Sequence, residues 1–383
     1  MNSVKSEIKD IKLHTLAFIH IGNGELLQKW LDFAEKKDHK GNGSDVFILD
    51  YDKLGKKFQE DGKNLAEWVK ALEGNDSEFL KLFLSPYVSK ETSLRVVESY
   101  DKVGLTLKEC LHDGRGYPYI PGSSIKGAIR TAVYSYLADQ NLLNKIERTF
   151  NINSGNIFKA QKETEKLVSN WQDATFGKIS DDIFKYLQVG DAFFQKGSEI
   201  IIDQINLNKK RNGFEMDESK RQSVEAIEFE KSSKFRIKLL QEFSKNKTTE
   251  HKSNEFRKKI DSEGLPFLFS LINQHTHSLV EKEIEFFKDE EGDIADYLAN
   301  MEDLLEVIKN CIPGKECVLR IGQASGWKFT TGDWTERLDE DTFYDLIVPM
   351  CRDQKKYGDF VFPKSRRIGD QSDLFGFIKL SME

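Results

Sequence analysis

Strand-like and helix-like hydrophobic patterns follow one another along this chain without a regular rhythm. Alternating apolar residues predict strands at residues 13–21, 46–49, 200–207, 226–229, 235–239, 317–321 and 377–380. Apolar residues at helical spacing predict helices at residues 62–100, 125–137, 141–170 and 241–310. A parallel α/β fold would repeat strand, helix and strand in turn, so the irregular order predicts an α+β fold.

The length of the chain favours two domains. Each half of its 383 residues is long enough to bury a core of its own. We expect an N-terminal domain at residues 1–145, a polar helical connection at 146–181 and a C-terminal domain at 182–383. The mostly helical stretch at about residues 241–310, which contains an acidic run, is expected to be an insertion in the second domain.

The charged residues are unevenly distributed. The net charge of −7 argues against nucleic-acid binding, because phosphate contacts need cations. The stretch Glu281–Glu306 is acidic, however, whereas Asn208–Arg211, Lys231–Lys238 and Arg352–Arg367 are basic. An acidic chain can therefore present a local basic track, and a solvated surface of mixed charge is the alternative.

The cysteines and the apolar runs indicate in which cellular compartment the protein is expected. The four cysteines are scattered and fit no standard zinc spacing, so we expect free thiols, no metal and no cofactor. Residues 1–6 contain no apolar core of a secretory signal, and no apolar run approaches the ~20 residues that span a bilayer. These observations predict a cytoplasmic protein with no membrane segment.

The segment that follows Pro121 predicts a helix with a phosphate site at its start. Ser123 or Ser124 is placed to cap this helix. Lys126 and Arg130 are four residues apart and so share a face, and Gly127 lets another backbone approach. Free amides, the positive end of the helix dipole and two cations together suit a phosphate group.

Two other interpretations of this helix start were weighed. A nucleotide P-loop has the same spacing of Gly122 and Gly127, but it needs Lys and Ser or Thr where this chain has Ala128 and Ile129. The P-loop is therefore rejected. A plain capped helix with two solvated cations explains the residues as well as a phosphate site does.

A second candidate is the loop of small residues at positions 321–327, directly after a predicted strand. Gly322 and Gly326 would let backbone amides reach a ligand, and Trp327 and Lys328 could add stacking and charge. The middle residue is Ala324, so the dinucleotide-binding glycine pattern is absent. A tight turn at the end of the strand is the alternative.

A third candidate is the predicted strand at residues 234–239. Period two places Lys234, Arg236 and Lys238 on one outward face, about 7 Å apart along the strand. Such a row could follow a phosphate backbone. The alternative is an edge strand that uses lysine to prevent aggregation.

Taken together, the chain resembles the RAMP superfamily of CRISPR-associated proteins from type III systems. The stretches that match the family's motifs, in its order, are 20–24, 119–130, 187–192, 321–327, 363–368 and 374–380. The segment Ile-Pro-Gly-Ser-Ser-Ile-Lys-Gly at 120–127 is the most specific of them. Ala192 and Ala324 depart from the family pattern. The resemblance adds His20, Arg366 and Arg367 to the expected RNA-binding residues.

The length and the two-part layout are most similar to the subunit of the type III-A Csm complex that caps the 3′ end of the guide RNA (crRNA). This resemblance implies two ferredoxin-like RAMP domains, as in RNA-recognition folds. It also implies that the partners are the guide RNA, the neighbouring backbone RAMP subunit and the small helical subunit of the complex.

Some RAMP proteins cleave RNA, so a metal-independent endoribonuclease that processes CRISPR RNA is the chief alternative. RNA cleavage without metal usually needs a positioned general base, often His. His112, beside Asp113 in a glycine-rich loop, is the best candidate, but the sequence identifies no partner for it. His14 and His20 stand on a strand among apolar residues, which favours burial. We therefore expect a non-catalytic RNA-binding subunit, and a purely protein-binding scaffold is a third class.

Overall fold

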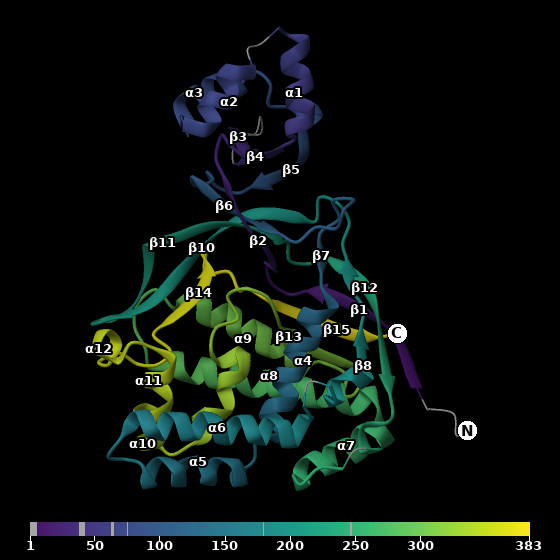
Figure 1. The fold of residues 1–383 in the computed structure, drawn as a ribbon, viewed down its shortest axis with the longest axis vertical. Coiled ribbons are helices and arrows are strands. Elements are labelled where there is room, and N and C mark those ends of the chain that lie inside the picture. The colour runs from purple at the N-terminus through teal and green to yellow at the C-terminus, as the bar shows by residue number, and fades with distance from the viewer. Residues whose placement is uncertain (1–5, 38–42, 63–64, 75, 179, 246) are drawn as a thin grey trace.

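The computed structural model of the protein describes residues 6–37, 43–62, 65–74, 76–178, 180–245 and 247–383 (Figure 1). The first five residues, on which the expected absence of a secretory signal partly rests, lie outside these ranges. Among the described residues, no helix combines the length and the apolar composition needed to cross a membrane.

One sheet of five antiparallel strands joins the two ends of the chain. Its strands, in spatial order, are β13 (Glu316–Arg320), β15 (Phe377–Met382), β1 (Ser6–Thr15), β12 (Ser232–Leu240) and β8 (Leu187–Val189). The expected alternation holds in β12, where Phe235, Ile237 and Leu239 are buried. Because β12 has a neighbour on each side, it is an interior strand.

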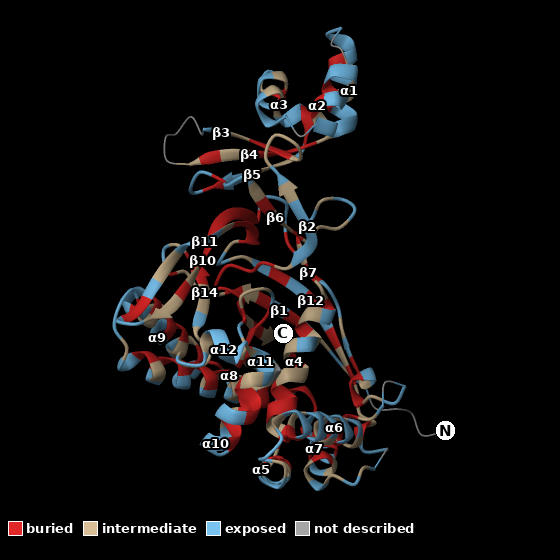
Figure 2. Ribbon diagram, turned by 60° about the vertical axis from the view of Figure 1, so that its left-hand side comes forward, coloured by how far each residue is buried: buried red, intermediate tan, exposed pale blue. Residues whose placement is uncertain are grey.

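Two helices cover the inner face of this five-stranded sheet. The helices α4 (Gly122–Leu137) and α8 (Leu265–Lys288) contribute Ile125, Ile129, Leu268 and Ile272 to a core that they share with the apolar residues of β1 and β12. Figure 2 shows the buried residues gathered where these helices meet the sheet. The apolar stripe predicted for α4 is therefore confirmed.

A longer mixed sheet crosses the first one and carries the upper part of the molecule. Its strands are β2 (Gly22–Gln28), β6 (Thr106–Cys110), β11 (Gly213–Ile227), β10 (Glu199–Lys210), β5 (Ser93–Ser99), β4 (Ser44–Leu49) and β3 (Phe33–Lys37), with β14 (Ser365–Gly369) also paired to β10. A small pair is formed by β7 (Tyr119–Ile120) and β9 (Ala192–Phe193). This pair lies beside the start of α4.

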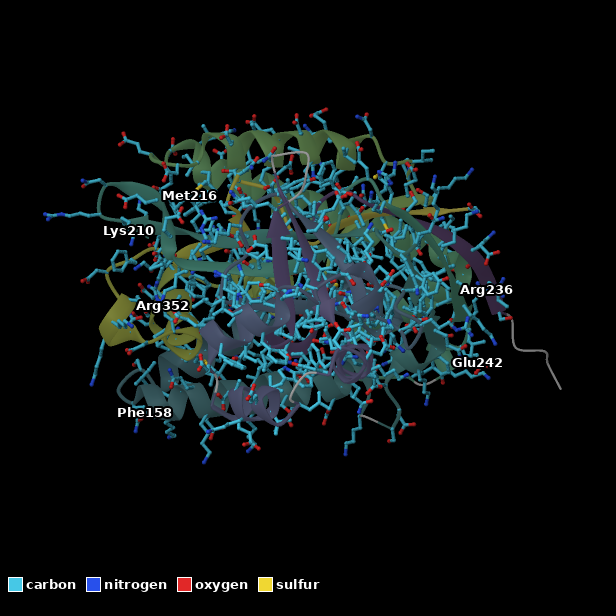
Figure 3. The ribbon with its side chains drawn as sticks, turned by 90° about the horizontal axis from the view of Figure 1, so that it is seen from above. Phe158, Lys210, Met216, Arg236, Glu242 and Arg352 are labelled. Atoms are coloured by element: carbon cyan, nitrogen blue, oxygen red, sulfur yellow. The ribbon has the colours of Figure 1, made fainter. Side chains whose placement is uncertain are left out.

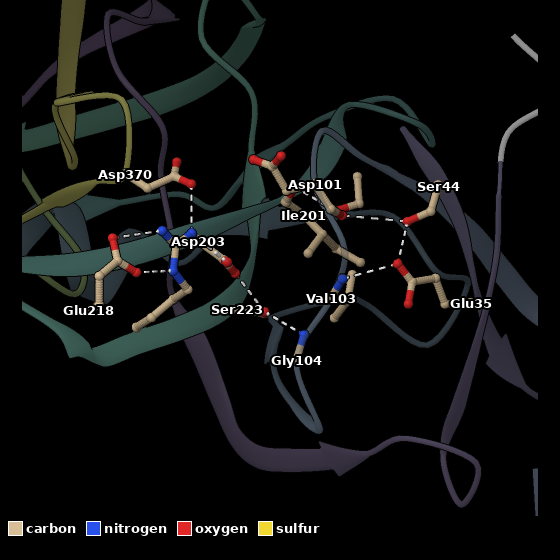
Figure 4. Close-up of polar contacts among 12 residues, drawn as sticks. Glu35, Ser44, Asp101, Val103, Gly104, Ile201, Asp203, Glu218, Ser223 and Asp370 are labelled. Carbon is tan, nitrogen blue, oxygen red and sulfur yellow. Dashed lines mark hydrogen bonds and ion pairs between the residues drawn. The ribbon is translucent and has the colours of Figure 1, made fainter. Parts of the chain in front are cut away.

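A small helical layer forms one end of the molecule. The helices α1 (Tyr51–Glu60), α2 (Leu65–Gly74) and α3 (Ser77–Leu84) pack on β3 to β5, around a separate core that contains Phe58 and Trp68 (Figure 1). A polar network lies below this layer (Figure 4). In it, Ser223 donates to Asp203 and accepts from the Gly104 amide, and Arg221 bridges Asp203 and Asp370.

The remaining helices lie along the opposite end and one side of the molecule (Figure 1). They are α5 (Gln140–Ile152), α6 (Ile157–Phe176), α7 (His251–Glu263), α9 (Ala295–Lys309), α10 (Glu340–Thr342), α11 (Val348–Cys351) and α12 (Gln354–Tyr357). The predicted helical stretch at about residues 241–310 thus contains α7, α8 and α9. Since α8 fills the core beneath the sheet, this stretch is not peripheral to the fold.

These sheets and helices confirm a fold of mixed strands and helices. The helix predicted for residues 62–100 is wrong at its end, where residues 93–99 form β5 between β4 and β10. The division into domains at 145 and 182 stays a prediction. It must accommodate β1, which lies between β12 and β15 of the predicted second domain.

Candidate nucleic-acid interface

The start of α4 is held by the protein's own carboxylate. The helix begins at Gly122 with Pro121 as its N-cap residue, so the prediction that Ser123 or Ser124 caps it is wrong. The Gly122 amide donates to Oδ1 of Asp191 at 2.7 Å. A methyl group at Gly122 would lie 2.1 Å from the Val189 carbonyl oxygen, so only glycine permits this approach. A phosphate at this site would compete with Asp191.

The two cations on α4 differ in their surroundings. The guanidinium of Arg130 pairs with Asp182 at 2.5 Å and lies over the rings of Phe176 and Phe184, at 4.6 and 5.3 Å. It is therefore part of the packing between α4 and α6, which the sequence pattern did not reveal. Lys126 is half-buried and has no ion pair among the described residues. Gly127 is exposed, and a methyl group there would meet no atom within 4 Å.

The cationic row on β12 lies on the outer face of the five-stranded sheet, opposite the helices. The side chains of Lys234 and Arg236 are 64% and 67% exposed, and Lys238 is half-buried. On the side away from β1, β12 pairs with β8 at residues 237–239, and the Gly190 amide donates to the Arg236 carbonyl at 2.9 Å. The edge-strand alternative therefore does not apply at Arg236 and Lys238.

Neighbouring strands extend this cationic face. Lys12 of β1 lies directly opposite Lys234, and Lys379 of β15 lies opposite His14. Partial burial and the charge of Lys12 lower the pKa of His14. The ion pair between Asp10 and Arg236, at 2.9 Å, is exposed and contributes about 0–1 kcal/mol, so Arg236 remains available to an anionic ligand. Lys379, by contrast, pairs with Glu316 at 2.9 Å, and both of these side chains are largely buried.

The three basic stretches do not form one continuous track. Seen from above, Arg236 lies at the opposite side of the molecule from Lys210 and Arg352 (Figure 3). The stretch Lys231–Lys238 therefore acts separately from Asn208–Arg211 and Arg352–Arg367.

The glycine-rich loop packs against the segment that follows β1. A methyl group at Gly322, whose φ is 77°, would lie 2.6 Å from the His20 carbonyl oxygen. The Gln323 amide donates to the same oxygen at 2.9 Å. Ala324 has a φ of 71°, in the region that favours glycine, which gives a physical reason for the family's commoner residue there. The loop thus joins two motifs that lie far apart in the sequence.

Several residues expected to touch RNA are buried or half-buried next to this loop. Lys328 and Arg366 both pair with Glu283, and Trp327 packs against Phe362 with ring centroids 4.8 Å apart. His20 is 1% exposed, and its Nδ1 lies 2.6 Å from the Glu225 carbonyl oxygen. Burial therefore contradicts direct RNA contact by His20 and Lys328, and the ion pair with Glu283 occupies Arg366, while RNA contact by the half-buried Trp327 stays a prediction.

The buried Glu283 cluster, which consists of Glu283, Tyr297, Lys328 and Arg366, supports the loop from below. The Arg366 Nη2 donates to Glu283 Oε2 at 3.1 Å, and the Tyr297 hydroxyl donates to Oε1 at 3.0 Å. Burial favours the neutral carboxyl, but the cations of Arg366 and Lys328 outweigh it and lower the pKa of Glu283. Glu283 is therefore ionised at neutral pH.

Arg367, by contrast, remains near the surface. It donates to Asn206 Oδ1 at 2.8 Å and has no carboxylate partner among the described residues. Burial, and then the charge of Arg367, lower the pKa of Lys108. Arg367 and Gly326 also line a pocket of about 30 Å³ in front of the loop.

His112 has partners that the sequence did not identify. Its Nε2 lies 3.7 Å from Glu199 Oε1 and 3.8 Å from Glu225 Oε1. Burial opposes protonation, but Glu199 and Glu225 outweigh it and raise the pKa of His112. These glutamates come from β10 and β11, and a single Glu within a strand carries no signal of its tertiary partner.

One of these two carboxylates, Glu225, is already paired with an arginine. Arg95 donates to both oxygens of Glu225 at 2.9 Å and to Glu109 at 2.7 Å. The ligand atoms of Glu109, His112 and Glu225 lie within 4.8 Å of one another, which is close enough for a metal ion. A metal would have to displace Arg95, so the residues present fit a buried ion-pair network better than a metal site.

Comparison with known proteins identifies similar sequences. The chain matches the family model described as RAMP superfamily over residues 12–327. It is 31% identical over 210 residues to the CRISPR system Cms protein Csm5 of Methanocaldococcus jannaschii, covering 53% of this chain and 45% of that protein. It is 29% identical over 230 residues to Csm5 of Streptococcus thermophilus, covering 55% and 59%. The chain therefore spans about half the length of the curated relatives it matches.

Two solved structures share the fold. One is a chain of the type III-A Csm–crRNA–target RNA complex, with a TM-score of 0.72 and 18% identity over 98% of this chain and 100% of that chain. The other is the crystal structure of T. onnurineus Csm5, with a TM-score of 0.63 and 18% identity over 96% and 99%. At this identity the likeness concerns the fold.

Proposed function

Because the chain belongs to the RAMP superfamily, we propose that it is a guide-RNA (crRNA) binding subunit of a type III-A CRISPR effector complex. Its curated relatives are Csm5 proteins, and a chain of the same fold occurs in a complex with crRNA and target RNA. These similarities, together with the ordered motifs of the sequence, support the proposal.

Within that complex we propose a position at the 3′ end of the guide RNA. The chain would contact the neighbouring backbone RAMP subunit and the small helical subunit, and would support crRNA maturation and antiviral defence in the cytoplasm. The support is the resemblance in length and motif order to the capping subunit of the Csm complex.

We also propose that the five-stranded sheet is a ferredoxin-like unit. Along the chain, its elements follow the order β1, α4, β8, β12, α8 and β15. In space, the strands lie in the order β15, β1, β12, β8, all antiparallel. This is the split β-α-β pattern of ferredoxin-like folds, including RNA-recognition domains. A second such unit, and the helical insertion within it, remain predictions.

The observation that carries the proposed RNA binding is the cationic row on β12. Where β12 has neighbours on both sides, at Arg236 and Lys238, there is no free edge that outward cations would need to protect. Their spacing of about 7 Å matches successive phosphates of an extended strand. The face is also broad, since β1 and β15 add Lys12 and Lys379.

We propose that the subunit does not cleave RNA. His112 is the best general base, but its side chain is only 10% exposed, and one of its two neighbouring carboxylates, Glu225, pairs with Arg95. The raised pKa keeps the imidazole protonated over more of the neutral range, which removes the base form. The endoribonuclease alternative also depends on His112, because a protonated histidine paired with a carboxylate can act as a general acid.

The test is RNA binding by a variant that lacks the row. Lys234→Gln, Arg236→Gln and Lys238→Gln are combined and compared with the wild type at several salt concentrations. We expect weaker binding and a salt slope that falls by about 1 per lost phosphate contact. The combined Lys159→Gln, Lys162→Gln and Lys166→Gln on α6 removes the same charge from exposed positions and should bind as the wild type does.

Equal affinities and salt slopes in the two variants would refute the role of β12. The length of the bound RNA, followed over time with and without divalent metal, addresses cleavage. Shortening that disappears in His112→Ala would favour the nuclease alternative.

A further inference from the structure

A surface groove lies at the end of the cationic row, between the outer face of the sheet and the loop that precedes α4. It has a volume of about 440 Å³ and is lined by Lys12, Tyr117, Phe193, Phe194, Gln195, Ser232, Ser233 and Lys234. Three aromatic residues, Tyr117, Phe193 and Phe194, and two lysines, Lys12 and Lys234, thus line the same groove. Neither Tyr117 nor Phe193 was among the residues expected from the sequence.

The aromatic side presents one free ring face. Phe193 is 48% exposed, and its ring stacks on Tyr119 with centroids 5.2 Å apart and an interplanar angle of 24°. The backbone of Phe193 is fixed by pairing with Tyr119 and by Ser233 Oγ, which donates to its carbonyl at 2.6 Å. An exposed phenylalanine on a fixed backbone is a stacking platform with little entropy left to lose.

The loop that bears Tyr117 is also ordered. Asp113 Oδ1 accepts from the Arg115 amide at 2.9 Å and from the Tyr117 amide at 2.8 Å. Lys196 lies 5.1 Å above the Tyr117 ring. The aromatic wall is therefore built into the structure before any ligand arrives.

The cationic side has a feature that the fold alone does not explain. Lys12 and Lys234 lie directly opposite each other on adjacent strands, an arrangement of like charges that destabilises a sheet. Lys234 pairs at 2.6 Å with Glu383, the last residue of the chain, and both side chains are substantially exposed. Lys12 has no carboxylate partner among the described residues. An anion held between the two ammonium groups would remove the repulsion.

We propose that this groove binds an unpaired nucleotide of single-stranded RNA. The base stacks on the free face of Phe193, and the adjoining phosphate lies between Lys12 and Lys234, displacing Glu383. This inference rests on the proposed RNA binding. It adds that an RNA strand bound along the cationic row of β12 reaches a site for an unstacked base. A duplex could not use it, because its bases are not available for stacking.

The experiment uses the full chain and a short oligouridine that carries one 2-aminopurine at successive positions. Phe193→Leu keeps an apolar side chain but removes the aromatic face, and we expect affinity to fall roughly 5-fold or more. Quenching of the 2-aminopurine, which reports stacking, should be lost in the same variant. Phe193→Trp should retain both. Phe158→Leu, at a residue of α6 that is 80% exposed, is the matched control and should behave as the wild type.

The possible failures are distinguishable. If the wild type binds the oligonucleotide but Phe193→Leu binds and quenches like Phe158→Leu, the groove is not the base site, while RNA binding itself stands. Equal loss of affinity for a duplex in Phe193→Leu would also overturn the inference. If the wild type binds no RNA at all, the proposed function and this inference both fall.

Discussion

Replacement of Glu283 by glutamine should sharply reduce the stability of the protein. Glu283 is 1% exposed and is the ion-pair partner of Arg366, whereas Lys328 lies 3.8 Å from Glu283 and 3.4 Å from Glu336, which remains in the variant. Removing one member of a buried ion pair costs about 3–5 kcal/mol, because the partner is left uncompensated. Glutamine retains an acceptor for Tyr297, which offsets about 1 kcal/mol. We therefore expect a loss of about 3 kcal/mol from a total that is about 5–15 kcal/mol for domains of this kind.

The assay is equilibrium urea denaturation, with a matched control on the same helix. Glu285 is two residues away on α8, and its side chain is 74% exposed and pairs with Lys288 at 2.9 Å. Glu285→Gln changes the charge equally but should cost less than about 1 kcal/mol. Equal losses in the two variants would refute the view that burial of the Glu283 cluster determines its contribution.

The pH dependence supplies a second readout. Since the folded pKa of Glu283 is lowered, its stabilisation is present above the unfolded carboxyl pKa of about 4.3 and is lost as the pH falls through the folded value. The difference in unfolding free energy between wild type and Glu283→Gln should therefore shrink in acid. A difference that stays constant into strong acid would mean that the charge of Glu283 is not what stabilises the fold.

Two further predictions concern the loop and His112. Gly322→Ala should lower the free energy of unfolding by about 2–4 kcal/mol, because the new side chain both strains the left-handed backbone and overlaps the His20 carbonyl. Gly326→Ala meets only the backbone strain and should cost about 1–2 kcal/mol. Thermal unfolding measures both variants, and equal losses of stability would contradict the packing of the loop on His20. The raised pKa of His112 means that its stabilisation is present below about pH 6.5 and is lost as the pH rises through the folded value. In urea titrations, the wild type should therefore be more stable than His112→Gln at low pH, and this difference should shrink as the pH rises. His251→Gln is the control, because the side chain of His251 is 88% exposed. A stability difference that does not change with pH would contradict the ion-pair network around His112.

Local patterns in the sequence predicted the local structure well. The alternation in residues 234–239 correctly placed Phe235, Ile237 and Leu239 inward, because the side chains of a strand point to opposite faces whatever lies around it. The apolar stripe of α4 was confirmed for the same kind of reason. The helix predicted through residues 93–99 failed because strand pairing with β4 and β10 overrode a local pattern.

The sequence by itself determined the class of fold and the inward and outward faces of its elements. It also determined the family, because the order of the motifs can be read without knowing which residues they contact. Only the tertiary structure decided which charges are available to a ligand. Lys328 and Arg366 carry the same charge as Lys234 and Arg236, yet the first two pair with the buried Glu283 and the second two face solvent. The physical reason is that the free energy of a charge depends on its burial and on neighbours within a few ångströms, and these come from strands and helices distant in the chain.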